Sequence, residues 1–341
     1  MQRALLPFAA LVLAACDPGQ GREAFTDSRP PPSLAPRFLA PEGWAWGVVQ
    51  AEGQPQLRYG VSSPVGTGTR AHVLIVPAYG ESAEVWFETA RQLNGQGYAT
   101  WVLERAGQGG SGRYLSPHDL GHTEGFEAGA DAVRSFIAGV IRPADDKPLI
   151  LLGAGDAALT VAMAAQAGAP ADAVILSGPD FRVQPPPRRW ESLASRLGLS
   201  RLPAPGWTAW SRAAPDDYAA GLASDPWRGK VRHAWQTANP DLRLTGASLG
   251  WAAAQSRALA QVLAAPAVSQ PVLILGPAEG TGAAQDFCGA QAACRYVAIT
   301  DPGNALHLGE NSHRTLWFKV ITDLISEESH QVRAVTPSPP A

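Results

Sequence analysis

The chain has 341 residues, of which 45% are hydrophobic, enough to bury the core of one large domain. Its net charge of -3 provides no electrostatic basis for binding nucleic acid, so we expect no partner of that class. The 35 glycines and 30 prolines favour a fold with many short connections over a long helical array.

The first fifteen residues have the pattern of an export signal. Arg3 supplies a positive start, and residues 4–15 form an apolar stretch too short to cross a bilayer as a helix. The stretch leads into residues 13–16 (LAAC), which resemble the lipobox of bacterial lipoproteins, where the cysteine is acylated and becomes the new N-terminus. The alternative is an ordinary signal peptide with a chance cysteine. The resemblance implies a cell-envelope protein anchored through Cys16, on the periplasmic side of the inner or outer membrane.

Both ends of the chain have the composition of flexible segments. Residues 16–41 are rich in proline, glycine, serine and charge, and we predict a tether there. Residues 326–341 are predicted to be a disordered tail. One folded domain is therefore expected at 42–325, and it contains no internal repeat.

Strand and helix patterns alternate along this domain. Apolar, β-branched runs predict strands at residues 71–76, 98–103, 148–152, 173–177, 271–275 and 295–299. Helical spacing of apolar residues predicts helices at 82–95, 126–140, 157–167 and 316–325. The alternation predicts an α/β fold, with a mostly parallel central sheet and helices on both faces.

The segment between the fourth and fifth of these strands is long and aromatic. Residues 181–270 have no strand pattern, yet they contain six of the eleven tryptophans. So long an insertion in a sheet domain is usually a functional lid, and we predict a helical lid rich in tryptophan. The alternative is that the tryptophans form the core of a helical subdomain.

Several motifs resemble one family. Residues 104–113 (ERAGQGGSGR) resemble a turn of the bacterial lysophospholipases, a branch related to monoglyceride lipases and serine aminopeptidases. Gly121-His122, followed by Phe126 and Asp131, resembles the segment after that turn, and the FC and CR pairs at 287–288 and 294–295 resemble a late pair of the family. The matches to its lid, at residues 224–226 and 246–251, are softer. Together the matches span about residues 40–325. The resemblance implies an α/β-hydrolase fold and a lipid or small ester as substrate.

The position of the nucleophile in this family has no serine here. The family places its serine on a tight strand-to-helix turn flanked by small residues. Here the strand at 148–152 is followed by Gly153, Ala154, Gly155 and Asp156, and the register without gaps places Gly155 at the serine. The family's acid and histidine fall on Gly280 and Leu306. Because all three positions differ, we predict that serine acyl-transfer chemistry is absent.

Chemically apt side chains stand one residue from each of these positions: Asp156, Glu279 and His307. If the third strand ran one residue longer, Asp156 would become the nucleophile, as in the haloalkane dehalogenases and epoxide hydrolases on this fold. The alternatives are a helix N-terminal residue for Asp156, a solvated loop acid for Glu279, and a surface or lid-contact histidine for His307.

The turn after the first of these strands contains Ala78 and Tyr79, whose backbone N–H groups are candidates for an oxyanion hole or for binding a carboxylate or phosphate.

We expect no cofactor and no metal. Three functions are left: a protein that binds an acyl lipid or a partner in the old cleft, an active hydrolase of lipid or small esters, and a hydrolase with Asp156 as nucleophile and His307 as base.

Two cysteines remain, Cys288 and Cys294. An oxidising compartment permits a disulfide, and we predict one between them, closing a short loop. Metal binding is the alternative, but no histidine stands at ligand spacing beside them.

Overall fold

The computed structural model describes residues 21–66, 68–115, 119–144, 146–181, 198–213, 216–217, 219–277 and 282–335, and side chains up to residue 332. The export signal, Cys16 and Glu279 lie outside these residues. None of the described helices is long and apolar enough to span a membrane.

The described strands form a single eight-stranded sheet in the order β1-β2-β4-β3-β5-β6-β7-β8. Their bounds are β1 Ala45–Val49, β2 Leu57–Ser62, β3 Ala71–Val76, β4 Tyr98–Leu103, β5 Leu149–Ala154, β6 Ala173–Ser177, β7 Val272–Gly276 and β8 Cys294–Ala298. All pairs from β4 to β8 are parallel, whereas β2 pairs antiparallel with both β1 and β4. Neither β1 nor β2 was predicted from the sequence, because β1 is partly exposed and β2 (LRYGVS) is not a continuous apolar run.

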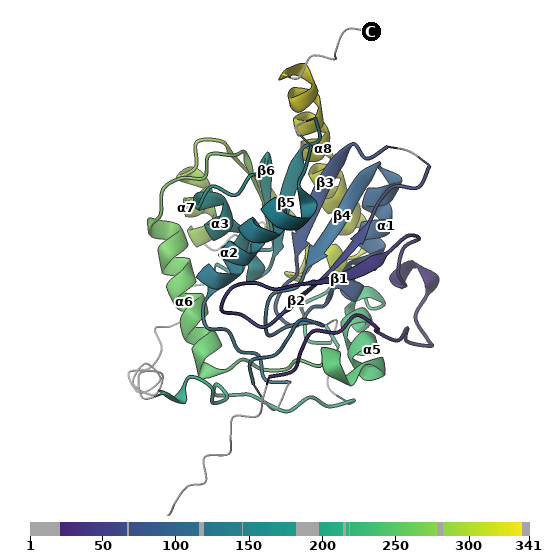
Figure 1. Ribbon diagram of the computed structural model, residues 1–341, viewed down its shortest axis with the longest axis vertical. Coiled ribbons are helices and arrows are strands. Elements are labelled where there is room, and N and C mark those ends of the chain that lie inside the picture. Colours follow the sequence, from purple (N-terminus) through teal and green to yellow (C-terminus); the bar gives the residue numbers. More distant parts are fainter. Residues whose placement is uncertain are drawn as a thin grey trace, which may run out of the picture.

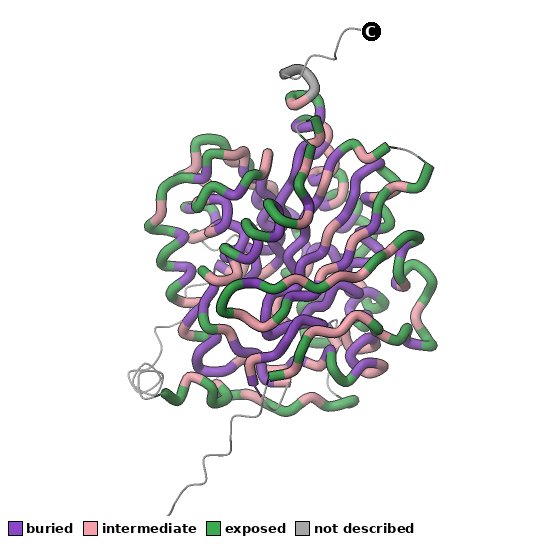
Figure 2. Tube along the Cα trace, in the orientation of Figure 1, coloured by how far each residue is buried: buried purple, intermediate pink, exposed green. Residues whose placement is uncertain are grey.

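Helices cover both faces of the sheet, which confirms the predicted α/β class (Figure 1). One core cluster joins the sheet to α2 (Phe126–Phe136), α3 (Ala157–Gln166), α6 (Leu249–Ala264) and α7 (Gly282–Gly289). A second joins its other face to η2 (Ala83–Trp86), α1 (Phe87–Gly95) and α8 (Asn311–Val335). Successive strand residues alternate between the clusters, as Leu151 and Leu152 do, because strand side chains point to opposite faces. Figure 2 shows the buried strands at the centre. A π-helical turn, η3 (Ile137–Ile141), follows α2.

The segment between β6 and β7 divides into two parts. Its last helix, α6, packs against α3 and buries Trp251 and Ala258 in the core, so α6 belongs to the helical layer of the sheet. The lid predicted at 181–270 is therefore too long at its C-terminal end. We call residues 198–248 the insertion; it contains η5 (Arg228–Lys230), α5 (Val231–Ala238) and η6 (Pro240–Leu242).

The ends of the described chain are more ordered than their composition indicates. The backbone of Arg113 donates to Arg22 O over 2.7 Å, and that of Phe25 donates to Gly110 O over 3.0 Å. Phe38, in the short helix η1 (Pro36–Phe38), is buried in a third core cluster. The predicted tether is therefore wrong for residues 21–41. The predicted tail is likewise wrong for residues 326–335, because α8 extends to Val335.

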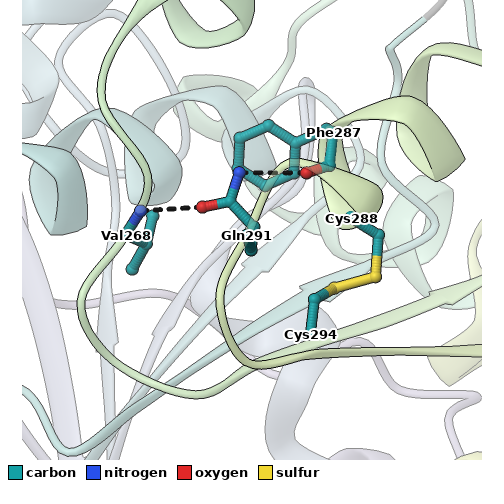
Figure 3. Close-up of a disulfide and its surroundings, with 5 residues drawn as sticks. All are labelled: Val268, Phe287, Cys288, Gln291 and Cys294. Carbon is teal, nitrogen blue, oxygen red and sulfur yellow. Dashed lines mark hydrogen bonds between the residues drawn. A yellow bond between two sulfur atoms is a disulfide. The ribbon is translucent and has the colours of Figure 1, made fainter.

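Cys288 and Cys294 form the predicted disulfide, with the two sulfur atoms 1.96 Å apart (Figure 3). The bond joins the end of α7 to the first residue of β8. Gln291 lies between the cysteines, accepting from Val268 N over 2.7 Å and donating to Phe287 O over 2.9 Å. Together the disulfide and this amide hold the α7–β8 turn against the loop that precedes β7.

Candidate active-site cleft

A cleft of about 640 Å³ lies between the insertion and the carboxyl ends of the parallel strands. This is where ligands bind in open α/β sheets. Its floor comes from the segments that follow β3, β5, β6 and β8, and its opposite wall comes from the insertion and the start of α6. The lining residues used below are Tyr79, Glu81, Gly155, Asp156, Trp210, Asp217, Arg232, Gln236, Trp251, Ala252 and His307.

The turn after β5 has the geometry of a nucleophile elbow without a nucleophile. Gly155 follows the last residue of β5 with φ +53, a left-handed conformation, and α3 begins two residues later. A Cβ on Gly153 would lie 2.8 Å from Ala157 O, so only glycine permits the close approach of strand and helix. A Cβ on Gly155 would lie 3.0 Å from Ala78 Cβ, at the turn after β3. Gly155 thus occupies the sharp point of the turn and offers no hydroxyl.

The carboxylate of Asp156 is held by fixed partners. Its φ of -70 and ψ of -23 are ordinary helical values, and its side chain is 5% exposed. Arg105 Nη2 donates to its two oxygens over 2.9 and 2.8 Å, and Tyr79 N donates over 2.7 Å. Burial raises the pKa of Asp156, and Arg105 opposes part of that rise. The hydrogen bonds described for this carboxylate include none to a histidine.

The backbone amides of the turn after β3 are already occupied. Ala78 N donates to Glu81 Oε2 over 3.2 Å, and Tyr79 N donates to Asp156. The next amide, Gly80 N, donates to Gln108 Oε1 over 2.8 Å. In this conformation neither Ala78 nor Tyr79 has an N–H group free for an oxyanion or an external anion. The sequence did not indicate that Glu81 and Asp156 accept hydrogen bonds from these two amides.

His307 lies in the cleft, on the short helix η7 (Leu306–Leu308) that precedes α8. Its Nε2 is 3.1 Å from Glu81 Oε1, and its ring stacks on Trp86 with centroids 3.9 Å apart. Nδ1 is buried and has no hydrogen-bond partner among the described residues. By contrast, Leu306, at the family's histidine position, is buried in the core.

Glu81 is a carboxylate of this site that the sequence did not single out. Burial acts to raise its pKa, but His307, Arg232 and a hydrogen bond from Trp86 outweigh burial and hold the pKa below its usual value. Trp86 Nε1 donates to Glu81 Oε2 over 2.9 Å. The available signal was an acid two residues after Tyr79, in the turn already singled out.

The insertion contributes a second ion pair to the cleft, between Arg232 of α5 and Asp217. Burial raises the pKa of Asp217. Gln236, one helical turn after Arg232, donates to Gly80 O over 3.3 Å. The ion pair lies within the insertion, and the Gln236 hydrogen bond ties the insertion to the turn after β3. No motif in the sequence predicts these contacts.

A serine–histidine contact does occur elsewhere, but it has a structural role. His122 Nδ1 lies 2.8 Å from Ser248 Oγ, and Ser248 accepts a hydrogen bond from Trp251 N over 3.1 Å as the N-cap of α6. Ser248 is fully buried and lies outside the cleft lining. Its hydroxyl is therefore a helix cap and not a nucleophile.

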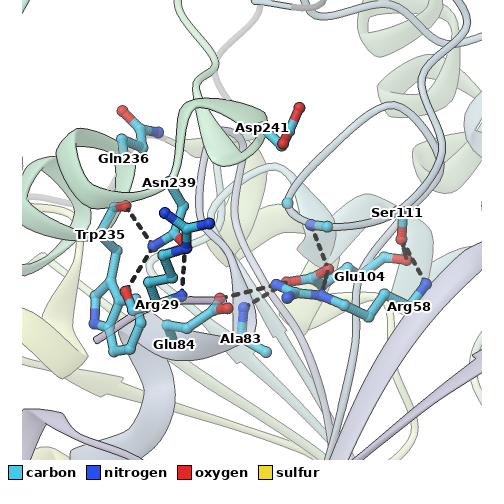
Figure 4. Close-up of polar contacts among 12 residues, drawn as sticks. Arg29, Arg58, Ala83, Glu84, Glu104, Ser111, Trp235, Gln236, Asn239 and Asp241 are labelled. Atoms are coloured by element: carbon cyan, nitrogen blue, oxygen red, sulfur yellow. Dashed lines mark hydrogen bonds and ion pairs between the residues drawn. The ribbon is translucent and has the colours of Figure 1, made fainter. Parts of the chain in front are cut away.

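The glycine-rich turn at 104–113 is likewise structural (Figure 4). Arg58 is fully buried and donates to Glu104 over 2.8 and 2.6 Å and to Glu84 over 2.9 Å. Glu104 also accepts from Ala83 N and Gly110 N. These contacts hold the turn that carries Arg105, and so they position the partner of Asp156.

The sheet order and the tight turn after β5 define an α/β-hydrolase. The model of the hydrolase family described as serine aminopeptidase, S33, matches residues 67–285, and the chain belongs to this family. No curated protein matches the chain.

Similar solved structures share the fold. A monoglyceride lipase from Saccharomyces cerevisiae is 17% identical, with a TM-score of 0.64, over 85% of this chain and 96% of that one. A carboxyl esterase from Bacillus coagulans is 14% identical, with a TM-score of 0.65, over 85% and 100%. A monoacylglycerol lipase from Paleococcus ferrophilus is 17% identical, with a TM-score of 0.59, over 79% and 98%.

Proposed function

We propose that this protein is a membrane-anchored member of the family that binds an acyl lipid or a partner in the cleft and carries out no serine-hydrolase chemistry. The observation that carries the proposal is Gly155 at the sharp point of the elbow. An acyl-enzyme needs a hydroxyl at that point, and glycine has none. Tyr79 N, a candidate donor for the oxyanion, supports the same conclusion because it already donates to Asp156.

The ligand class follows from the cleft and from what similar folds act on. A cleft of about 640 Å³ lies within the usual range for small-molecule sites. Two of the similar structures are named as monoglyceride or monoacylglycerol lipases, and a monoacyl lipid is therefore the first ligand to test. The anchor is proposed from the LAAC sequence that ends in Cys16.

An active hydrolase of lipid or small esters is the second candidate, and one observation favours it. His307 and Glu81 line the cleft together, and a histidine–carboxylate pair is what general-base catalysis on bound water would use. The version with Asp156 as nucleophile has less support, since that carboxylate is paired with Arg105.

The proposal is tested first with a fluorophosphonate probe and with turnover of a monoacylglycerol and a p-nitrophenyl ester. We expect no labelling of any serine and no turnover. The Gly155→Ser variant is also expected to show no ester turnover, because Tyr79 N still donates to Asp156. Ester turnover that disappears in His307→Ala would overturn the proposal and establish the second candidate.

Binding is tested separately, as the rise in Tm on adding monooleoylglycerol. Ala252 is exposed and lines the cleft on α6, so Ala252→Trp should fill the mouth and abolish the rise. Ala264 is exposed on the same helix about 18 Å further along, outside the cleft, and Ala264→Trp is the matched control. An unchanged rise in Ala252→Trp would show that the lipid binds elsewhere.

A further inference from the structure

The first described residues of the chain are docked against the insertion. They also contact the glycine-rich turn at 104–113, where Arg22 Nη2 donates to Ser111 O over 2.9 Å. Arg29 N donates to Asn239 Oδ1 over 2.6 Å, and Asn239 Nδ2 returns a hydrogen bond to Arg29 O over 2.9 Å (Figure 4). Asn239 directly follows α5 of the insertion. The chain therefore leaves the described domain on the side where the insertion lies.

Very little chain separates this docked segment from the proposed anchor. Gly21 follows Cys16 by five residues, which span at most about 18 Å when fully extended. An acyl group on Cys16 would therefore keep the docked segment within about 18 Å of the membrane surface. A tether of this length restricts which face of the domain can meet the bilayer.

Residues 198–213 of the insertion have the composition of a membrane-interface segment. They contain two leucines, two tryptophans, two arginines and no acidic residue, although the whole chain has a net charge of -3. Leu199 is 41% exposed and Leu202 is 49% exposed. Both tryptophans are half-buried, so the two leucines are the exposed large apolar side chains of the segment. Leucine enters the acyl boundary, while arginine reaches anionic headgroups with its charged end.

The same segment borders the cleft. Leu249 N donates to Leu202 O over 2.9 Å, which ties the segment to the start of α6, and Trp210 lines the cleft. Arg243 places its guanidinium 3.9 Å from the ring centroid of Trp210. Arg113, which donates to Arg22 O, also donates to Arg243 O over 3.5 Å, so these contacts connect the docked N-terminal residues to the cleft wall. In Figure 1 the segment and the docked residues share the lower end of the molecule.

We propose that residues 198–213 form the surface on which the protein rests on a lipid bilayer, held there by the short anchor, so that a lipid enters the cleft from the membrane. The proposal rests on the anchoring in the proposed function. Arg201 lies 3.8 Å from the exposed Glu124, and an anionic headgroup would replace that carboxylate as its partner.

The test uses the full-length acylated protein in vesicles of phosphatidylcholine with a minority of phosphatidylglycerol. Leu202→Cys and Val65→Cys are each labelled with a polarity-sensitive fluorophore. Cys288 and Cys294 are joined in a disulfide, and in the acylated protein Cys16 would carry no free thiol, so the introduced thiol would be unique. Val65 is 66% exposed in the loop before β3, at the amino ends of the parallel strands, opposite the cleft. It is the matched control.

We expect lipids brominated in the acyl chain to quench the label at position 202 several-fold more strongly than the label at position 65. Inserting a long glycine–serine linker after Asp17 should reduce that difference. Equal quenching at the two positions, or stronger quenching at 65, would overturn the proposal. So would a Cys16 found by mass spectrometry to carry no acyl group. That last result leaves the Gly155 and cleft-binding experiments unaffected, so failure of the docking surface is distinguishable from failure of the binding function.

Discussion

The two sides of the cleft differ in how their polar groups are used. On the elbow side, formed by Gly155, Asp156 and Arg105, the carboxylate is neutralised by an arginine and also takes up the Tyr79 amide. On the histidine side, formed by Glu81, Trp86 and His307, the carboxylate faces an imidazole instead of an arginine, with His307 Nε2 3.1 Å from Glu81 Oε1. Each side keeps a buried nitrogen without a hydrogen-bond partner among the described residues, Arg105 Nε on the elbow side and His307 Nδ1 on the histidine side. The elbow carboxylate is therefore paired with a guanidinium and the carboxylate of the histidine side with an imidazole, so substitutions on the two sides are expected to have different effects.

The largest effect is expected from removing the elbow carboxylate, which should lower the stability of the protein. Asp156→Ala would leave Arg105 buried without its anion, and losing one partner of a buried pair costs about 3–5 kcal/mol in free energy of unfolding. Urea denaturation measures this. The control is Asp131→Ala, which breaks an exposed pair with Arg134 and should change stability by less than about 1 kcal/mol. Equal stability of the two variants would mean that the elbow side has no structural role.

A smaller effect is expected from adding a side chain at the elbow. In Gly155→Ser the serine must adopt a left-handed backbone conformation at φ +53, and its Cβ lies 3.0 Å from Ala78 Cβ. We expect the free energy of unfolding to fall by about 1–3 kcal/mol. Gly168 has φ +77, and a Cβ added there would meet no atom within 4 Å, so Gly168→Ser measures the backbone strain alone. If Gly168→Ser lost as much stability as Gly155→Ser, contact with Ala78 would not contribute.

The smallest effect is a difference in pH dependence between the two sides. Burial raises the folded-state pKa of Asp156, so its contribution favours folding at low pH and is lost as the pH rises from about 3.9 through the folded pKa. The pKa of Glu81 is lowered, so its contribution is present above about 4.3 and is lost as the pH falls through the folded pKa.

Unfolding free energies of Asp156→Asn and Glu81→Gln, measured against pH from about 3 to 7, test these signs; each unit of pKa shift is worth about 1.4 kcal/mol. Relative to the unmodified protein, Asp156→Asn should gain stability as the pH rises. Glu81→Gln should lose stability relative to it over the same range. Changes of the same sign in both variants would contradict the contrast between the two sides.

Much of the fold was predictable because the central strands are buried on both faces. Such strands appear as continuous apolar runs, and β3, β4 and β6 have the bounds that the sequence predicts. The N-terminal segment was not predictable, since its order comes from contacts such as Arg29 with Asn239, which are 210 residues apart. Composition alone does not reveal that such a partner exists.

The candidate site divides in the same way. The glycine at the elbow can be read directly from the sequence, so the lack of a nucleophilic hydroxyl followed from the residues alone. The assignment of Asp156 was open in the sequence, where it stood as either a nucleophile or a helix N-terminal residue. Its ion pair with Arg105, 51 positions away, supports the second interpretation.

The sequence by itself determined the α/β class, the position of the tight turn after β5 and the absence of a serine there, because apolar runs and residue identity are local properties. Only the tertiary structure decided what the surrounding polar groups do. Asp156 meets Arg105 and His307 meets Glu81 because the strand order brings the ends of separate strands to one edge of the sheet. Hydrogen bonding and burial at that edge depend on distances of a few ångströms, which no pattern along the chain specifies.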